Sequence, residues 1–163
     1  MTGEASAAFR VAQVRDAGAF DVGLLAALQE AAFEGEADAQ AWGAAALSEL
    51  LAGPGVLGLI VEAADRPLGY LLVRLAAGEA ELLSLGLLPA ARGLGLGQVL
   101  LDSLCTRLRA LDVEDLFLEV AVDNAAARRL YRRRGFREAG RRRAYYDRGG
   151  TRVDAVIMRL DTR

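Results

Sequence analysis

The sequence predicts a mixed α/β domain. Three features favour this fold: short runs in which apolar and polar residues alternate, longer segments with apolar residues three and four positions apart, and a glycine-dense turn that joins a strand pattern directly to a helix pattern. The chain has 163 residues, a length typical of one domain with a sizeable core. We therefore expect a single domain over residues 1–163, without a linker or an internal repeat.

Strand and helix patterns follow one another in the first half of the chain. The first helix pattern places Leu24, Leu25, Leu28 and Ala32 on one face, and the second ends at a Gly-Pro-Gly sequence that stops a helix. The expected elements, in order, are a strand over Phe9–Val14, a helix from Asp16, a loop over Glu34–Gln40, a helix over Trp42–Leu51, and strands over Val56–Ala63, Leu68–Ala76 and Glu79–Leu88.

The second half continues the alternation. A leucine stripe at helical spacing follows the glycine-dense turn, and a shorter helix lies between a capping Asn124 and a terminating Gly135. The expected elements are a helix over Gln98–Leu111, a strand over Leu116–Val122, a helix over Ala125–Arg134, and strands over Phe136–Ala139 and Val153–Leu160.

The glycine-dense turn, with Gly93, Gly95 and Gly97 at alternate positions, indicates a phosphate-binding loop. Glycines let the backbone approach a ligand closely, and the start of the next helix adds a partial positive charge. A P-loop requires lysine, which this chain lacks, and the dinucleotide-binding GxGxxG pattern is broken by Gln98 and Leu100. A glycine-rich turn without a ligand is the alternative that these residues alone leave open.

The composition excludes several kinds of chemistry. The chain contains no histidine, no lysine and one cysteine, so Cys/His zinc sites, disulfides, histidine triads and lysine Schiff bases are excluded. Cys105 falls on the apolar side of its helix, which predicts a buried structural thiol. Proton transfer is left to carboxylates, tyrosines or water, and we expect no metal.

The formal net charge is only −2, but arginines gather between Arg128 and Arg143. Such a cluster is compatible with nucleic-acid binding, and a solvated protein face is the alternative. Because no aromatic residues are interleaved with the triple-arginine runs, we favour the solvated face and expect no direct nucleic-acid binding. No apolar run approaches the roughly 20 residues of a membrane span. We therefore expect a cytoplasmic protein.

Two motifs together carry a family resemblance. Arg92-x-x-Gly95-x-Gly97 is followed by Leu118-Glu119-Val120, Asn124, Leu130-Tyr131 and Gly135-Phe136, in an order and separation that resemble the GNAT superfamily of N-acetyltransferases. The resemblance covers roughly residues 79–160. It implies a single GNAT-type α/β domain with a mixed, mostly antiparallel central sheet and helices on both faces. It also implies a coenzyme-binding core over about residues 79–139 and acetyl-coenzyme A as the acetyl donor.

The resemblance implies roles for individual residues. Strand alternation places Glu119 on the face opposite Leu118 and Val120, where the family has its general base, and Tyr131 corresponds to the general acid. The implied coenzyme-binding residues are the backbone of a splayed strand (Leu85, Gly86, Leu87), the pyrophosphate loop (Arg92, Gly93, Leu94, Gly95, Leu96, Gly97, Gln98) and Asn124. The implied substrate-binding residues are Trp42, Tyr145 and Tyr146.

The C-terminal region sharpens the resemblance. Arg142-Arg143-Ala144-Tyr145-Tyr146, followed by Asp154–Met158, is similar to the signature of the bacterial ribosomal-protein-alanine N-acetyltransferases, the RimI subgroup. This implies direct acetyl transfer to the N-terminal alanine of a small-subunit ribosomal protein by a monomer or weak dimer. Residues 34–41 depart from the subgroup's usual form. A transferase for small-molecule amines and a non-catalytic acetyl-coenzyme A sensor are the alternative functions.

Overall fold

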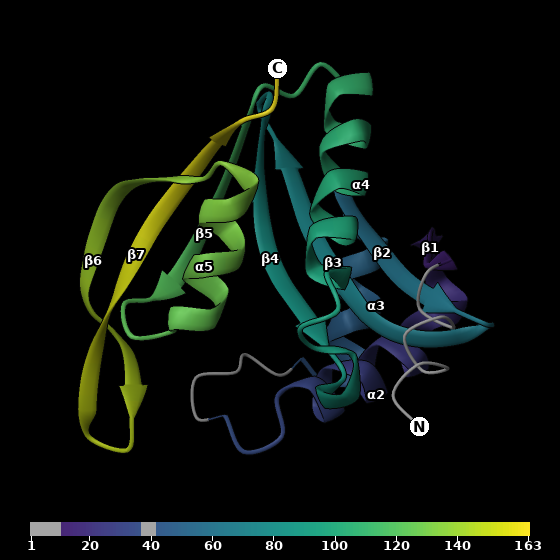
Figure 1. The fold of residues 1–163 in the computed structure, drawn as a ribbon, viewed down its shortest axis with the longest axis horizontal. Helices are drawn as coiled ribbons and strands as arrows, with labels where there is room; N and C mark the ends of the chain where they lie inside the picture. Colours follow the sequence, from purple (N-terminus) through teal and green to yellow (C-terminus); the bar gives the residue numbers. More distant parts are fainter. Residues whose placement is uncertain (1–10, 37–41) are drawn as a thin grey trace.

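A seven-stranded sheet organises the molecule, in the order β1-β2-β3-β4-β5-β7-β6. The structure is a computed structural model that describes residues 11–36 and 42–163. All neighbouring strands are antiparallel except β4 and β5, which are parallel (Figure 1). The strands are β1 (Gln13–Ala17), β2 (Val56–Ala63), β3 (Arg66–Ala76), β4 (Glu79–Leu87), β5 (Asp115–Ala121), β6 (Arg137–Arg148) and β7 (Thr151–Asp161). This confirms the predicted mixed, mostly antiparallel sheet.

Helices cover both faces of the sheet because its central strands are apolar on both sides. On β2, Leu59 and Val61 belong to a buried cluster with α4 and α5, whereas Ile60, between them, belongs to a cluster with α2 and α3. The helices are α2 (Val22–Ala32), α3 (Ala44–Ala52), α4 (Leu96–Ala110) and α5 (Ala125–Arg134). The expected helices on both faces are therefore present.

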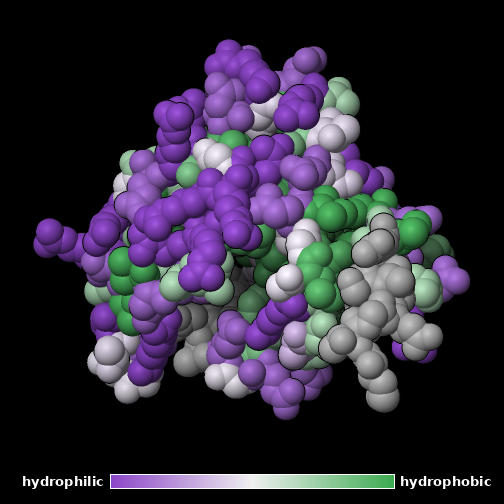
Figure 2. All heavy atoms as spheres, viewed as in Figure 1, coloured by the Kyte–Doolittle hydropathy of each residue, from purple (hydrophilic) through white to green (hydrophobic). Residues whose placement is uncertain are grey.

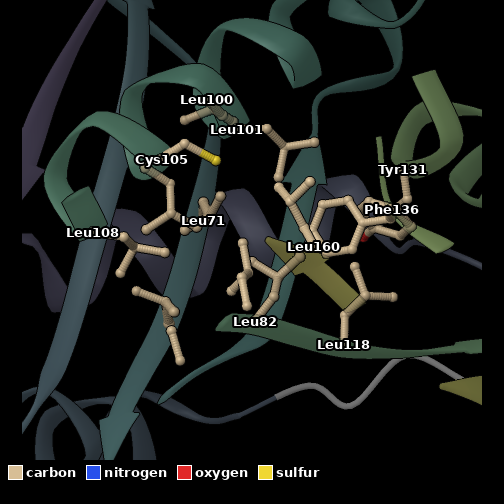
Figure 3. Packing of buried hydrophobic residues seen from close by; sticks show 14 of the residues in the cluster. Leu71, Leu82, Leu100, Leu101, Cys105, Leu108, Leu118, Tyr131, Phe136 and Leu160 are labelled. Atoms are coloured by element: carbon tan, nitrogen blue, oxygen red, sulfur yellow. The ribbon is translucent and has the colours of Figure 1, made fainter. Parts of the chain in front are cut away.

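The larger core lies between the sheet and α4 (Figure 3). Residues of α4 at helical spacing, among them Leu100, Leu104 and Leu108, are fully buried against β3 and β4. Cys105 lies in the same row and is fully buried, and this burial raises the pKa of its thiol. The predicted burial of this cysteine is confirmed, and its thiol is poorly suited to act as a nucleophile.

The predicted N-terminal boundaries are wrong. We expected a strand over Phe9–Val14 and a helix from Asp16, but β1 includes Asp16, and a 3₁₀ turn, η2 (Ala19–Asp21), precedes α2. The physical reason is tertiary: β1 pairs with β2, and Arg15 donates hydrogen bonds to Glu62 and to Asp21. Residues 9 and 10 of the expected strand and residues 37–40 of the expected loop lie outside the described residues.

The strand predicted over Phe136–Ala139 is present, but its predicted C-terminal end is wrong, because β6 (Arg137–Arg148) runs on to Arg148. β6 is an edge strand of twelve residues, none of them buried, so it lacks the apolar alternation that reveals a strand in the sequence. It pairs with β7 through a turn at Gly149 and Gly150, both with positive φ. Val56–Ala63 and Ala125–Arg134 match their predicted bounds, and the other expected elements shift by one or two residues at most ends.

Candidate active site

A cavity opens where the two parallel strands part. β4 and β5 pair only from Glu79–Glu81 to Asp115–Phe117, and beyond this point they separate (Figure 1). A cavity of about 770 Å³ lies between them, lined by Leu82–Leu85 of β4 and Leu118–Ala121 of β5. Because β4 remains paired with β3 on its other side, its edge toward the cavity offers backbone groups without a strand partner.

Glu119 lies on the wall of this cavity formed by β5. Its neighbours Leu118 and Val120 are buried in the core below α4, so alternation turns Glu119 toward the opposite face, as predicted. Its carboxylate forms an ion pair with Arg142, with Nε and Oε1 2.7 Å apart. The hydroxyl of Tyr145 also donates to it, and this bond is the main reason that the pKa of Tyr145 is raised.

A bulge in β6 brings Arg142 and Tyr145 to the same carboxylate. Residues three apart in a regular strand point to opposite faces. Here Arg142 pairs with Ala155 and Tyr146 with Val153, so three residues of β6 lie opposite Asp154 alone. Within the bulge, Ala144 has a φ of +50° and its amide donates to Oδ1 of Asp154 over 2.8 Å. The bulge therefore resets the alternation and joins two side chains that the sequence places on opposite faces.

Tyr131 reaches the same cavity from α5. Its ring packs against Phe136, with ring centroids 5.5 Å apart, and the residue is only 8% exposed. Burial raises the pKa of its phenol well above the usual value near 10. Its hydroxyl makes no hydrogen bond to any described residue. The phenol is therefore protonated at neutral pH and available to donate a proton into the cavity.

The glycine loop has the backbone of an anion site. Gly93 and Gly95 have φ values of +74° and +81°, and α4 begins at the next residue, Leu96. None of the amides from Gly93 to Gly97 donates to an acceptor within residues 11–36 and 42–163. Gly97 permits close contact between α4 and α5, because a Cβ there would lie 3.0 Å from the Leu130 side chain. Five successive free amides at a helix N-terminus suit a phosphate group.

The two polar side chains of this loop are engaged with the protein. Nη2 of Arg92 donates to the carbonyl of Ala32 at the end of α2 over 2.5 Å, and Nε2 of Gln98 donates to the carbonyl of Leu130 over 2.9 Å. Neither residue lines the cavity. Their bonds instead fix the loop to segments that continue into the cavity wall, at Phe33 and Tyr131.

The remaining predicted residues divide into two groups. Leu85, Asn124, Trp42, Tyr145 and Tyr146 line the cavity together with Glu119 and Tyr131. Asn124 also caps α5, since its side chain accepts a bond from the amide of Ala127. Gly86 and Leu87 do not line the cavity; a Cβ on Gly86 would lie 2.7 Å from the Tyr70 ring.

Several lining residues were not predicted from the sequence. Phe33, Glu36, Leu82–Ser84, Asp123 and Arg148 line the cavity, and Arg142 contacts Glu119 beside it. Arg142 stood in a segment that resembled the RimI subgroup, which was the available signal. The others carry no sequence pattern that distinguishes them from surface or core residues.

The arginine-rich side of the molecule is strongly hydrophilic over α5 and β6 (Figure 2). Several of its arginines pair with carboxylates: Arg128 and Arg132 both contact Glu138, and Arg134 contacts Asp102. Among the described residues, no cluster of metal-ligating side chains is found, and no described helix is long and apolar enough to cross a membrane.

Comparisons with known proteins agree with this geometry. The model of the acetyltransferase (GNAT) family matches residues 24–136. A [ribosomal protein bS18]-alanine N-acetyltransferase from Salmonella typhimurium is 38% identical over 108 residues, which cover 66% of this chain and 73% of the relative. A putative enzyme of the same description from Bacillus subtilis is 33% identical over 110 residues, covering 68% and 72%.

Solved structures show the same fold. The crystal structure of the ribosomal-protein-S18-alanine N-acetyltransferase from Escherichia coli superposes with a TM-score of 0.83 at 27% identity, covering 93% of this chain and 94% of that one. A ribosomal-protein-alanine N-acetyltransferase from Brucella melitensis gives a TM-score of 0.79, covering 91% and 99%. The chain therefore belongs to the GNAT family and is an acetyl-coenzyme A-dependent N-acetyltransferase, similar to the bS18-alanine N-acetyltransferases.

Proposed function

We propose that this enzyme acetylates the N-terminal alanine of ribosomal protein bS18, with Glu119 as the general base and Tyr131 as the general acid. The observation that carries the proposal is that a carboxylate and a protonated phenol line one cavity from different elements, β5 and α5. The named activity of the relatives from Salmonella typhimurium and Bacillus subtilis supports this substrate.

The residues present fit acetyl-coenzyme A. The free amides of Gly93–Gly97 would hold the pyrophosphate, and the unpaired edge of β4 around Leu85 would bind the pantetheine arm. The coenzyme supplies the activated acetyl group as a thioester. Arg92 and Gln98 would act by fixing the loop rather than by contacting phosphate, because both side chains already bond to the protein.

In this proposal, Glu119 prepares the attacking amine. An N-terminal amine has a pKa of about 7.7–8.0, so at neutral pH it arrives mostly as an ammonium ion that cannot attack. Glu119 accepts the proton, directly or through water, and leaves a lone pair on nitrogen. Cys105 is buried on the α4 side of the sheet, so this chain's cysteine is not placed to carry the acetyl group.

Tyr131 is placed to complete the proton balance. Acetyl transfer leaves a thiolate, which is a better leaving group when a neutral acid protonates it as it departs. The Tyr131 phenol is neutral at physiological pH, since a free tyrosine ionises only near pH 10 and burial raises the pKa of Tyr131 further. Tyr131 lines the same cavity as Glu119, which supports the proposal that the proton acceptor and the proton donor serve one bound pair of substrates.

Free-thiol release from acetyl-coenzyme A tests the proposal. We expect release that depends on a peptide carrying the bS18 N-terminus, with mass spectrometry placing the acetyl group on the α-amine. The matched control is the same peptide with a blocked N-terminus, which should give no release. Release with polyamines or aminoglycosides in place of the peptide would favour a small-molecule transferase. Coenzyme binding without any release would favour a sensor.

Two substitutions test the residue roles. Glu119→Gln and Tyr131→Phe should each lower kcat by about 10²- to 10⁴-fold, the usual contribution of one acid or base, while coenzyme binding is retained. Tyr70→Phe is the matched control, because Tyr70 bonds to Ser84 and does not line the cavity. Wild-type kcat in either active-site variant would contradict the corresponding role.

A further inference from the structure

The carboxylate proposed to receive the substrate's proton already has a cationic partner. Nε of Arg142 lies 2.7 Å from Oε1 of Glu119, and the Arg142 guanidinium carbon lies 5.5 Å from the centre of the Tyr145 ring. The Arg142 side chain is 56% exposed and the Glu119 side chain 19%. An amine that enters as an ammonium ion must therefore approach Glu119 beside a guanidinium.

The other charged and titratable groups that line the cavity or the adjoining groove come from four elements and two loops. Glu79 begins β4, Glu36 follows α2, and Asp123 lies between β5 and α5. Arg74 and Glu81 face each other across β3 and β4, Tyr131 comes from α5, and Tyr145 and Tyr146 come from β6. On β7, the residue paired with Glu119 is the apolar Ile157. Arg148 and Asp123 also line the cavity, and Arg148 donates a hydrogen bond to Asp123. Within the described residues, Arg142 alone forms an ion pair with Glu119.

Arg142 also lines a second, smaller groove. This groove of about 300 Å³ adjoins the cavity and is lined by Arg142, Phe117 and Ile157, among other residues. Glu119 lines both this groove and the larger cavity. The bulge at Ala144 fixes this position, because it directs Arg142 and Tyr145 to one carboxylate. The fold of β6 therefore fixes the position of the ion pair between Arg142 of β6 and Glu119 of β5.

A bare carboxylate would bind the substrate ammonium as an ion pair. Such binding stabilises the enzyme–substrate complex before deprotonation, so it lowers KM. It does not stabilise the transition state equally, so the free-energy barrier to deprotonation and acetyl transfer becomes higher. A neighbouring guanidinium weakens that ion pair by like-charge repulsion and favours the neutral amine. The effect applies only while the amine is charged.

We propose that Arg142 is a positioning residue that orients Glu119 and prevents it from trapping the substrate amine as a tight ion pair. The proton passes from the substrate ammonium to the Glu119 carboxylate, and Arg142 keeps its own proton throughout. This inference rests on the proposed role of Glu119 as the base. It makes the charge of Arg142, rather than its contact area, the property that matters.

The test compares Arg142→Gln with the wild type across pH, using the bS18 peptide. At pH 7 we expect KM and kcat both to fall, each by about 3- to 10-fold, because the ammonium complex becomes too stable. In the profile of kcat against pH, the acidic limb should shift to higher pH by about 0.5–1 unit, which corresponds to the same 3- to 10-fold change in rate. Above pH 9, where the free amine is neutral, the KM values should converge.

Two further variants make the test specific. Arg142→Lys keeps the charge and should restore the wild-type KM at pH 7. Arg143→Gln removes a neighbouring exposed arginine that has no partner among the described residues, and should leave both parameters unchanged. Coenzyme A without an acetyl group forms a complex with enzyme and peptide that cannot react. When the peptide is titrated into enzyme with coenzyme A, it should bind more tightly to Arg142→Gln than to the wild type at pH 7, and equally to both above pH 9.

Failure of the inference can be distinguished from failure of the proposed function. A KM that rises in Arg142→Gln, or a kcat profile that does not move while Glu119→Gln is inactive, overturns the inference alone. Such a result would make Arg142 an ordinary peptide contact. If Glu119→Gln keeps the wild-type kcat, the proposed base is wrong, and the role of Arg142 is wrong with it.

Discussion

The two walls of the cavity are built from different materials. On the β4 side, the chain offers backbone: an unpaired strand edge along the cavity and, beyond the lining residues, the free amides of the glycine loop. On the side formed by β5, α5 and β6, it offers side chains: Glu119, Tyr131 and their neighbours. The backbone wall depends on positions where side chains are missing, whereas the side-chain wall depends on contacts made at or near the surface.

This difference indicates how each wall responds to substitution. The backbone wall is supported from behind, where the Tyr70 ring lies against Gly86 and its hydroxyl bonds to Ser84 over 2.7 Å. The side-chain wall is held by half-exposed groups, such as the Arg142–Glu119 pair and the bond from Ala144 to Asp154. Changes to the first wall should therefore affect coenzyme binding and stability, and changes to the second should affect the peptide.

The largest effect on coenzyme binding is expected in the glycine loop. Gly95→Ala places a Cβ at a φ of +81°, which costs about 1–2 kcal/mol for a residue other than glycine. If the loop relaxes to avoid this cost, coenzyme binding must restore it, and the Kd for coenzyme A should rise by about 5- to 30-fold. Isothermal titration calorimetry measures this directly.

Gly78 provides a matched control for this experiment. It has a φ of +82° in the turn between β3 and β4, and, as at Gly95, a Cβ there would meet no atom within 4 Å. Gly78→Ala should lower the stability of the fold by a similar amount and leave the Kd for coenzyme A unchanged. Equal affinities in the two variants would show that the loop conformation does not contribute to binding.

The sequence predicted the backbone wall better than the side-chain wall, and the reason is physical. Glycines at alternate positions report directly on a backbone conformation, so the loop between β4 and α4 could be located from its letters. Strand alternation also placed Glu119 on the correct face. Arg142 could not be assigned, because its position depends on the bulge, and alanine at a φ of +50° leaves no sequence signal.

The same reasoning explains the errors at the two ends of the sheet. β6 is an exposed edge strand, so its arginines and tyrosines lack the apolar alternation on which strand prediction depends. The direction of the Arg92 side chain was likewise set by a distant partner, the carbonyl of Ala32, sixty residues earlier. The extent of β6 and the direction of the Arg92 side chain thus depend on contacts between segments far apart in the chain, which local sequence patterns do not report.

An intermediate effect is expected at the bulge. Asp154→Ala removes the acceptor of the Ala144 amide, a bond worth about 0.5–1.5 kcal/mol. Tyr145 and Arg142 should then lose their fixed places beside Glu119, and kcat/KM for the bS18 peptide should fall by about 3- to 10-fold, as measured by steady-state thiol release.

Asp154→Asn is the control at the bulge, because its amide oxygen can still accept the bond from Ala144, and its kcat/KM should stay near the wild-type value. The Kd for coenzyme A should be unchanged in both variants. A weaker coenzyme affinity in Asp154→Ala would show that the two walls are not independent.

The smallest effect on activity is expected behind the backbone wall, at Tyr70. Tyr70→Phe removes the bond to Ser84 and should cost about 1 kcal/mol of unfolding free energy at pH 7, with kcat and KM unchanged. Burial raises the pKa of the Tyr70 phenol to about 12, whereas a tyrosine in the unfolded chain ionises near 10. Between about pH 10 and pH 12, the Tyr70 phenol therefore keeps its proton in the folded state and loses it in the unfolded state.

The sign of the pH dependence follows from this difference. The stabilisation from a neutral Tyr70 is fully present below pH 10 and is lost as the pH rises toward 12, at about 1.4 kcal/mol per unit. Urea unfolding between pH 7 and 12 should show a shallower decline in Tyr70→Phe, with the remaining slope due in part to Tyr131, whose pKa is raised in the same direction. An unchanged slope would mean that the Tyr70 phenol ionises as easily in the folded state. The buried Tyr70 side chain would then not stabilise the backbone wall, and the rigidity of this wall would have to come from the pairing of β4 with β3 alone.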